Sequence, residues 1–400
     1  MDLTALRVPG LPERFFRNLL LVSVYGFALS LLLGRGTYKP SLYLCLFAAT
    51  GCLLCGRNRF GPDRPLLIVL GFGLAFLLQG WIMADRPISG AFQWAILSSL
   101  LVAAAVTWLP DRFGGRWRLT HGTASTAVLV LFVAAQGVAY RWPVNKAGLF
   151  SNVHYLALYT VITLPALYFF VLETGTAARW LLVLALAGDF WLLLKTQSRP
   201  GFLALLAASL AAIPYLSKRH RLIAASAIVL VPAALYFTGL LGFADRVNDL
   251  VANFAREERP VIWRETLELQ SRSTMAQWWF GHGLGQFHWD YQAISSFHSR
   301  REDYYSPHNF LLDLLYSHGI AGLISFLLAY GLLFGKLAAV TSQSRERSGK
   351  AVGMLLISMS TAHLVHGFLT MPFFSRHNLH PLSLILGACL RYFRENDRHA

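Results

Sequence analysis

Apolar runs of about the length that crosses a lipid bilayer dominate this chain. A helix needs about 20 mostly apolar residues to cross a hydrocarbon core of about 30 Å. Only 14% of the residues are charged, whereas a soluble domain carries about 25%. The sequence therefore predicts an all-α polytopic membrane protein. We expect about twelve transmembrane helices, at roughly 17–33, 39–56, 65–83, 91–108, 124–140, 152–172, 178–194, 200–216, 221–239, 308–335, 351–371 and 379–393.

One long hydrophilic run interrupts this pattern. It divides the chain into an expected nine-helix part (1–239), a large loop (240–307) and a three-helix part (308–400). Within the loop, Glu257 and Glu258 precede Pro260, and acidic residues in a first turn with proline near the first position are typical of a helix start. We therefore expect the loop to contain short helices.

The basic residues predict how the chain is oriented in the membrane. Of the 35 lysines and arginines, 20 lie at the termini and in alternate turns, whereas the short turns on the other side hold 8. Lysine and arginine accumulate in cytoplasmic turns, so both termini are expected in the cytoplasm and the loop outside. The net charge of +15 is thus explained by the orientation of the chain in the membrane, and no nucleic-acid partner is expected.

The two ends of the chain and the cysteines add little further constraint. No small-residue cleavage site follows the first apolar run, so we expect a retained first helix instead of a cleaved signal. All four cysteines lie in apolar runs, and the pair Cys52 and Cys55 is expected to be buried as small apolar residues. No disulfide is therefore expected in the loop.

Two basic residues lie in a tight outward turn, where basic residues are disfavoured. Lys195 and Arg199 flank Ser198, and Pro200 follows directly as expected at the first position of a helix. An arginine beside the unpaired N–H groups of a helix start suits a phosphate oxyanion. The alternative is that the Arg199 guanidinium extends to the lipid head groups at the membrane surface. These residues alone do not decide between the two.

The loop and its end offer further candidates. Arg259 and Arg264 are five residues apart, so they do not share one stripe of a helix, and at most one need face a site. His308 follows Pro307 at the expected outer edge of the tenth span, where an imidazole can act as a general base. Asn309 is expected to cap or orient. The alternative is that His308 itself only caps the helix start.

Other residues could approach the same place. Asp313 lies about one and a half turns beyond His308, and His363 and His366 lie near the outer end of the eleventh span. No metal site is expected, because the outer face lacks ligands at metal-binding spacing. Gly281, Gly283 and Gly285 follow no strand, so a turn back toward the membrane is a better interpretation than a dinucleotide site.

Several motifs, taken in order, resemble the O-antigen ligase/polymerase superfamily. They are Ser198-Arg199 at a span start, Arg259-x-x-x-Trp263, Gly281-x-Gly283-x-Gly285-x-Phe287, His308-Asn309-x-x-Leu312 and Gly319-x-x-Gly322. The stretch from Gly148 to Ala157 is also similar, although it has Val153-His154 where the family usually has Pro-Asn. The resemblance covers about 142–326 by motif and the whole chain by the number of spans.

The resemblance implies a glycosyltransferase of the GT-C type in the cell inner membrane, acting on the periplasmic face. Such enzymes move a glycan from undecaprenyl diphosphate to an acceptor hydroxyl. Twelve spans with one large late loop fit a ligase that uses lipid A–core as acceptor, whereas a polymerase would use the same residues. A transporter is the non-enzyme alternative, and it would need mid-span charges, of which Asp189 and Asp313 are the main cases.

The expected mechanism follows from this resemblance. His308 is the general base, and Arg199 and Arg259 hold the diphosphate as it leaves. We expect no metal and no cofactor, because fixed arginines can take the role of a divalent ion. The remaining candidates for diphosphate or substrate binding are Arg264, Lys195, Asn309, Asp313, His363 and His366.

Overall fold

The protein is helical throughout the part that the structure describes. This computed structural model describes residues 13–32, 38–55, 64–107, 117–140, 147–150, 152–173, 176–239, 258–296 and 304–397, and isolated positions between 244 and 252. These ranges contain no β-strand. The all-α prediction is therefore confirmed for the described residues.

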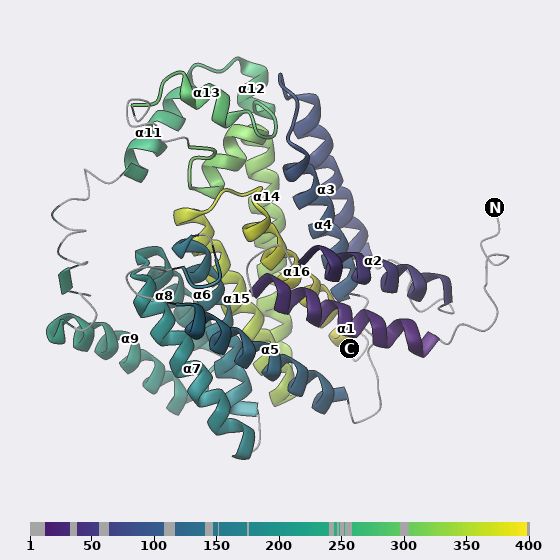
Figure 1. Ribbon diagram of the computed structural model, residues 1–400, viewed down its shortest axis with the longest axis vertical. Helices are drawn as coiled ribbons and strands as arrows, with labels where there is room; N and C mark the ends of the chain where they lie inside the picture. The colour runs from purple at the N-terminus through teal and green to yellow at the C-terminus, as the bar shows by residue number, and fades with distance from the viewer. Residues whose placement is uncertain are drawn as a thin grey trace. The chain divides into compact units, whose positions relative to one another are not determined.

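A helix covers each of the twelve predicted apolar runs (Figure 1). These helices are α1 (Glu13–Leu32), α2 (Tyr38–Cys55), α3 (Arg64–Ile82), α4 (Gly90–Thr107), α5 (Trp117–Ala139), α6 (Val153–Glu173), α7 (Thr176–Thr196), α8 (Arg199–Ala212), α9 (Lys218–Thr238), α14 (Phe310–Gln343), α15 (Arg347–Thr370) and α16 (Arg376–Asp397). Among the described residues, six helices are long and apolar enough to cross a membrane, namely α3, α4, α6, α9, α14 and α15. Several helices thus have the length and composition of membrane spans, and twelve crossings stay a prediction.

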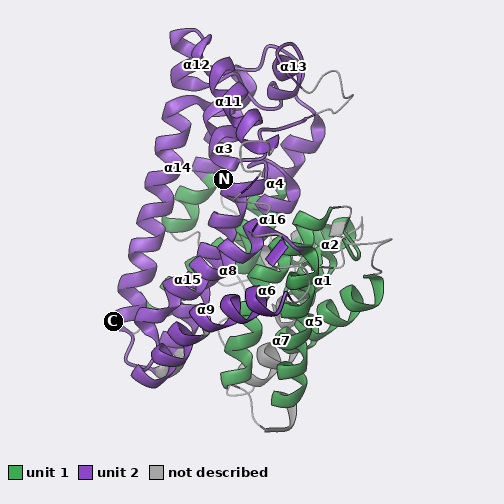
Figure 2. Ribbon diagram, turned by 90° about the vertical axis from the view of Figure 1, so that its left-hand side faces the viewer, with its two compact units in different colours: residues 1–70, 98–196, 380–400 green, residues 71–97, 197–379 purple. Residues whose placement is uncertain are grey.

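The chain divides into two compact units, each built from separate stretches (Figure 2). Unit 1 contains residues 1–70, 98–196 and 380–400. In it α1 packs on α2 and α5, and α6 packs on α7. Asp189 is fully buried between α6 and α7, where Thr163 Oγ1 donates to its Oδ2 at 2.6 Å. This mid-span carboxyl group is hydrogen-bonded by a neighbouring helix of its own unit.

Unit 2 contains residues 71–97 and 197–379, and it includes the loop. The loop forms α11 (Glu258–Ser271), α12 (Met275–Phe280) and α13 (Phe287–Gln292), so the expected short helices are present. All three gather at one end of α14, while α15 packs along α14 and α8 along α15 (Figure 1). A buried cluster of Ile262, Phe287, Tyr291 and Tyr316 joins the loop to α14. The loop is therefore folded onto a helix of its own unit.

The helix α14 differs from the single span expected from residue 308 onward. Gly319 has φ 66° and ψ −170°, which interrupts the helix after its first nine residues. A continuous helix of 34 residues would be about 50 Å long, well beyond the ~30 Å of the hydrocarbon core. The break separates a short segment under the loop, residues 310–318, from a remainder of membrane-crossing length.

The glycine-rich segment after α12 docks the loop on α3 and α14. Gly281, Gly283 and Gly285 all have positive φ. The His282 N–H donates to the Tyr316 carbonyl at 2.8 Å, and the Leu284 N–H donates to the Gly80 carbonyl at 3.1 Å. A Cβ on Gly281 would lie 2.3 Å from the backbone of Ser317. These contacts show that the segment turns the loop back onto α3 and α14, whereas its position relative to the membrane stays a prediction.

Gly319→Ala is expected to lower the unfolding temperature by a few degrees. The backbone conformation at Gly319 is accessible essentially to glycine alone and costs other residues about 1–3 kcal/mol. The new Cβ would also lie 2.4 Å from the backbone of Trp279. Thermal unfolding of detergent-solubilised protein, followed by tryptophan fluorescence, measures the effect.

Gly331→Ala is the matched control, because it lies on the same helix with nothing within 4 Å of its added Cβ. A helical alanine there is expected to be neutral or to stabilise by up to about 1 kcal/mol. Equal unfolding temperatures for Gly319→Ala and the wild type would contradict the proposed strain at the break.

Candidate functional site

His308 lies at the junction between the loop and α14. It has φ 51°, an uncommon backbone conformation for a residue other than glycine. The next residue, Asn309, is the helix cap, and its Oδ1 accepts from the N–H groups of Leu311 and Leu312 at 3.0 and 3.2 Å. Because Asn309 already caps the helix, the half-buried imidazole of His308 is not needed for that purpose.

The surroundings of His308 favour its neutral form. Burial lowers the pKa of the imidazole below 6.5, and the nearby Arg259 guanidinium lowers the pKa further. A hydrogen bond to the backbone of Thr370 and the charge of Glu258 oppose this shift in pKa only in part. A neutral imidazole keeps one unprotonated nitrogen, and this is what a general base requires.

Arg259 reaches the same place from the first turn of α11. It is half-buried, and its Nη1 donates to the carbonyl of Leu369 at 3.1 Å, next to the residue that bonds His308. Trp263, one turn later, donates from Nε1 to the carbonyl of Pro307 at 3.1 Å. Two hydrogen bonds thus hold α11 against both the end of α15 and the chain just before His308.

The two loop arginines have different surroundings. Arg264 is exposed, whereas Arg259 acts electrostatically on His308. The sequence leaves this choice open, because it depends on which side of α11 packs against α15. The structure brings Arg259 to His308 and leaves Arg264 at the surface.

Two residues beside His308 were not predicted from the sequence. The Tyr304 hydroxyl donates to Glu258 Oε2 at 3.0 Å, and the Tyr304 ring meets the His308 ring edge-on at 5.7 Å between centroids. Glu258 was recognised only as an acidic residue at a helix start. No sequence signal relates Tyr304 to Glu258, which is 46 residues away.

Asp313, His363 and His366 lie beneath this site and are buried. Asp313 Oδ2 accepts from the N–H of Phe373 at 2.7 Å. The His363 Nε2 lies 2.9 Å from the carbonyl of Asn378, so it is the donor of that hydrogen bond. His366 Nδ1 lies 3.2 Å from the hydroxyl of Thr370, whose backbone bonds His308. These residues support the connection from α15 to α16, and their direct binding of substrate stays a prediction.

Arg199 is the first residue of α8, as the sequence predicts. Ser198 caps this helix, with its Oγ accepting from the Gly201 N–H at 3.2 Å. Arg199 is half-buried, and α8 packs along α15, the helix that carries Leu369 and Thr370 at its end. Lys195 belongs to unit 1, where its Nζ lies 5.7 Å from the centroid of the Trp191 ring.

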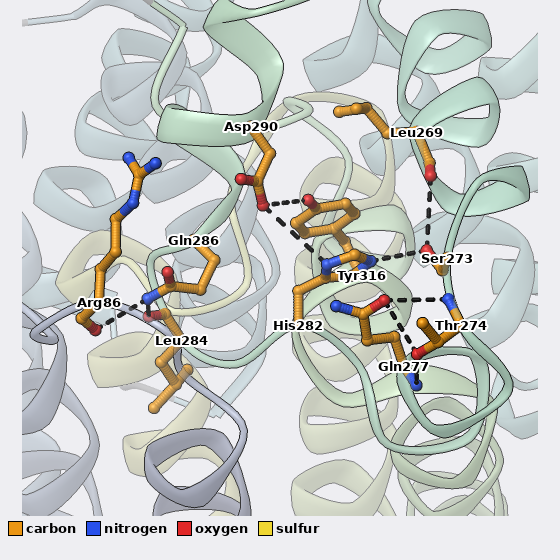
Figure 3. A network of polar contacts seen from close by, with 10 residues as sticks. All are labelled: Arg86, Leu269, Ser273, Thr274, Gln277, His282, Leu284, Gln286, Asp290 and Tyr316. Atoms are coloured by element: carbon orange, nitrogen blue, oxygen red, sulfur yellow. Dashed lines mark hydrogen bonds and ion pairs between the residues drawn. The ribbon is translucent and has the colours of Figure 1, made fainter.

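A second polar network lies between the loop helices and α14 (Figure 3). His282 Nε2 is 2.7 Å from Ser273 Oγ, and its ring stacks on Tyr316 at 4.3 Å. The His282 Nδ1 is 4.0 Å from Asp290 Oδ2, which is beyond hydrogen-bond distance. The Tyr316 hydroxyl donates to that same Asp290 oxygen at 2.5 Å. The network therefore lacks the carboxylate–imidazole bond of a catalytic triad. It ties the loop to α14.

The described residues contain no group of three or more His, Cys, Asp or Glu side chains placed to hold a metal ion. The predicted independence from metal ions stays a prediction.

Comparison with known proteins identifies a similar family. A family model described as O-antigen ligase matches residues 180–327. This segment contains Lys195, Arg199, Arg259, Arg264, His308, Asn309 and Asp313, whereas His363 and His366 lie outside it. A search of curated proteins found no match. The resemblance seen in the sequence motifs is confirmed over this segment, which is similar to the O-antigen ligase family.

Proposed function

We propose that this protein transfers an O-antigen glycan from undecaprenyl diphosphate to a sugar hydroxyl of lipid A–core, on the periplasmic face of the inner membrane. The observation that carries the proposal is the pairing of His308 with Arg259. A half-buried imidazole kept neutral by its surroundings lies beside a fixed guanidinium, at the junction of the loop and α14. Both residues lie in the segment that matches the O-antigen ligase family.

The reaction needs a base at the acceptor and a cation at the leaving group. The hydrogen bond from His308 to the Thr370 backbone uses the ring N–H, which leaves the other nitrogen as acceptor. That nitrogen removes the proton of the acceptor hydroxyl. At the same time, the hydroxyl oxygen attacks the anomeric carbon of the donor sugar. The bond from this carbon to the diphosphate oxygen breaks, the electron pair leaves with the diphosphate, and the anomeric configuration inverts.

Arginine is suited to the leaving group. Its guanidinium donates two parallel hydrogen bonds to phosphate oxygens and stays charged at every relevant pH. Arg259 and Arg199 therefore stabilise the charge that develops on the diphosphate as it departs. The diphosphate linkage supplies the free energy, so no nucleotide is required.

The test is a transfer assay with purified protein, carrier-linked glycan and lipid A–core. We expect glycan-bearing lipid A–core to form at the same rate with and without EDTA. A loss of activity in EDTA that Mg²⁺ restores would contradict the metal-free mechanism. If no glycan-bearing lipid A–core forms from intact carrier-linked glycan, the proposed function is overturned.

A polymerase would use the same base and arginines. The phenotype of a strain that lacks this protein therefore distinguishes a ligase from a polymerase. Loss of a ligase leaves long glycan chains on the carrier lipid. Loss of a polymerase leaves single repeat units attached to lipid A–core. We expect the first outcome, and the second would reassign the acceptor while keeping the chemistry.

The transfer rate is expected to fall at low pH with a midpoint below 6.5. His308 must be neutral to accept a proton, and burial together with Arg259 lowers its pKa below that value. The rate is thus full above this lowered pKa and is lost as the pH falls through it. Arg259→Gln removes the nearby cation, so the midpoint of the residual activity should move to higher pH. An unchanged midpoint would contradict the coupling of the two residues.

A further inference from the structure

Aromatic residues lead from His308 to the outer surface of the loop, in two sets of ring contacts that the consecutive residues Tyr304 and Tyr305 join. The ring of Tyr304 meets His308 edge-on and packs inward against the buried cluster of the loop. The next residue, Tyr305, points the other way and stacks on His288, with ring centroids 4.3 Å apart and planes 16° apart. His288 in turn meets Trp289 at 5.1 Å.

The outer rings of this series are exposed but held in place. Tyr305 is 65% exposed and Trp289 is 48% exposed. His288 lies against both rings, and Gln292 Nε2 lies 3.3 Å from His288 Nε2. One face of Tyr305 is stacked on the His288 imidazole, and the exposed part of the residue leaves the other face accessible to a ligand. Exposed aromatic surface that is rigidly supported is typical of a binding site.

Arg86 adds a positive charge at the far end. The Arg86 guanidinium lies 5.2 Å from the centroid of the Trp289 ring. Gln286 Nε2 donates to the backbone carbonyl of Arg86 at 3.1 Å. The turn between α3 and α4 is one of the short outward turns in which basic residues are disfavoured. The contact with Trp289 gives this arginine a defined position.

We infer that Tyr305, Trp289 and Arg86 bind the glycan chain of the carrier-linked donor, behind the sugar that reacts at His308. The inference rests on the proposed function. A pyranose ring has an apolar C–H face that packs on a flat aromatic ring, and its hydroxyls need polar neighbours, which His288 and Gln292 supply. Arg86 suits the carboxylate of an acidic sugar. A lipid tail would not use these polar groups, and they lie on the hydrophilic loop.

Binding is tested without the reaction. The probe is O-antigen polysaccharide released from its lipid by mild acid, and the protein is the full-length His308→Ala variant in detergent. Tyr305→Ala and Trp289→Ala, each added to this background, are expected to weaken binding about tenfold, which is 1.4 kcal/mol. Tyr305→Phe keeps the ring and should bind normally. Unchanged binding in both alanine variants would overturn the inference.

Trp279→Ala is the matched control. Trp279 lies on α12 in the same loop and is 49% exposed, close to the value for Trp289, but none of the ring contacts described above involves it. This variant should bind the polysaccharide as well as its parent. Loss of binding there as well would show a general effect of removing exposed aromatic residues and would overturn the assignment.

Transfer kinetics separate this inference from the proposed function. With the otherwise wild-type protein, Tyr305→Ala should raise KM about tenfold for a long carrier-linked glycan and leave kcat unchanged. A carrier with a single repeat unit does not reach the outer rings, so its KM should not change. Equal effects on both donors would overturn the inference, whereas an inactive wild-type protein would instead overturn the proposed function.

Discussion

His308→Ala is expected to lower the rate of glycan transfer by about 10²- to 10⁴-fold, the usual contribution of a general base. The alanine variant has no group to accept the proton of the acceptor hydroxyl. Binding of the carrier-linked glycan should change little, because Arg259 and Arg199 remain. The measurement is single-turnover transfer with purified protein, together with donor binding.

The control for this prediction is His220→Ala. His220 lies in the first turn of α9, on a turn expected to face the cytoplasm, and its Nδ1 contacts Ser217. This variant should transfer glycan at the wild-type rate. If His308→Ala also transfers normally, His308 is not the base. If it unfolds at a much lower temperature than the wild type, its loss of activity would not identify a base, and His308→Gln, which keeps a polar side chain, would then be measured.

Arg259→Ala is expected to lower kcat by about 10²- to 10³-fold, the effect of removing a single group that stabilises transition-state charge. The guanidinium is held by the Leu369 carbonyl and influences His308. The charge on the departing diphosphate would no longer be balanced. Arg259→Lys keeps the charge but loses the paired geometry, so partial activity is expected.

Arg264→Ala is the matched control, since Arg264 lies on the same helix but is exposed. Its activity should remain close to that of the wild type. The opposite result, with Arg264→Ala inactive and Arg259→Ala active, would mean that another face of α11 approaches the diphosphate. Equal losses in both would indicate a general electrostatic effect of the loop.

Much of the helical architecture was accessible from sequence because its signals are local. Helix α8 begins where Pro200 predicts, and α14 begins at the cap supplied by Asn309. Both signals operate within a few residues. The position of His308 at the loop junction follows directly from the second cap.

The surroundings of that junction could not be predicted in the same way. The sequence does not show that Asp313 turns inward to hold the Phe373 N–H, nor that Tyr304 bonds Glu258. Each partner is far away in the chain, and which side chains meet depends on how complete helices pack. A candidate such as Asp313 is polar and close in sequence, but these properties do not reveal which way its side chain points.

Sequence by itself determined the helical membrane-type pattern, the positions of the long helices, the resemblance to the O-antigen ligase family and the residue at the loop junction. Apolar length, caps and motif order encode these features within short stretches. Only the tertiary structure decided that Arg259, not Arg264, accompanies His308, and that α14 breaks at Gly319, where its backbone meets that of Trp279. These features arise from contacts between distant segments, whose geometry is set by the packing of the loop onto α14 and α15.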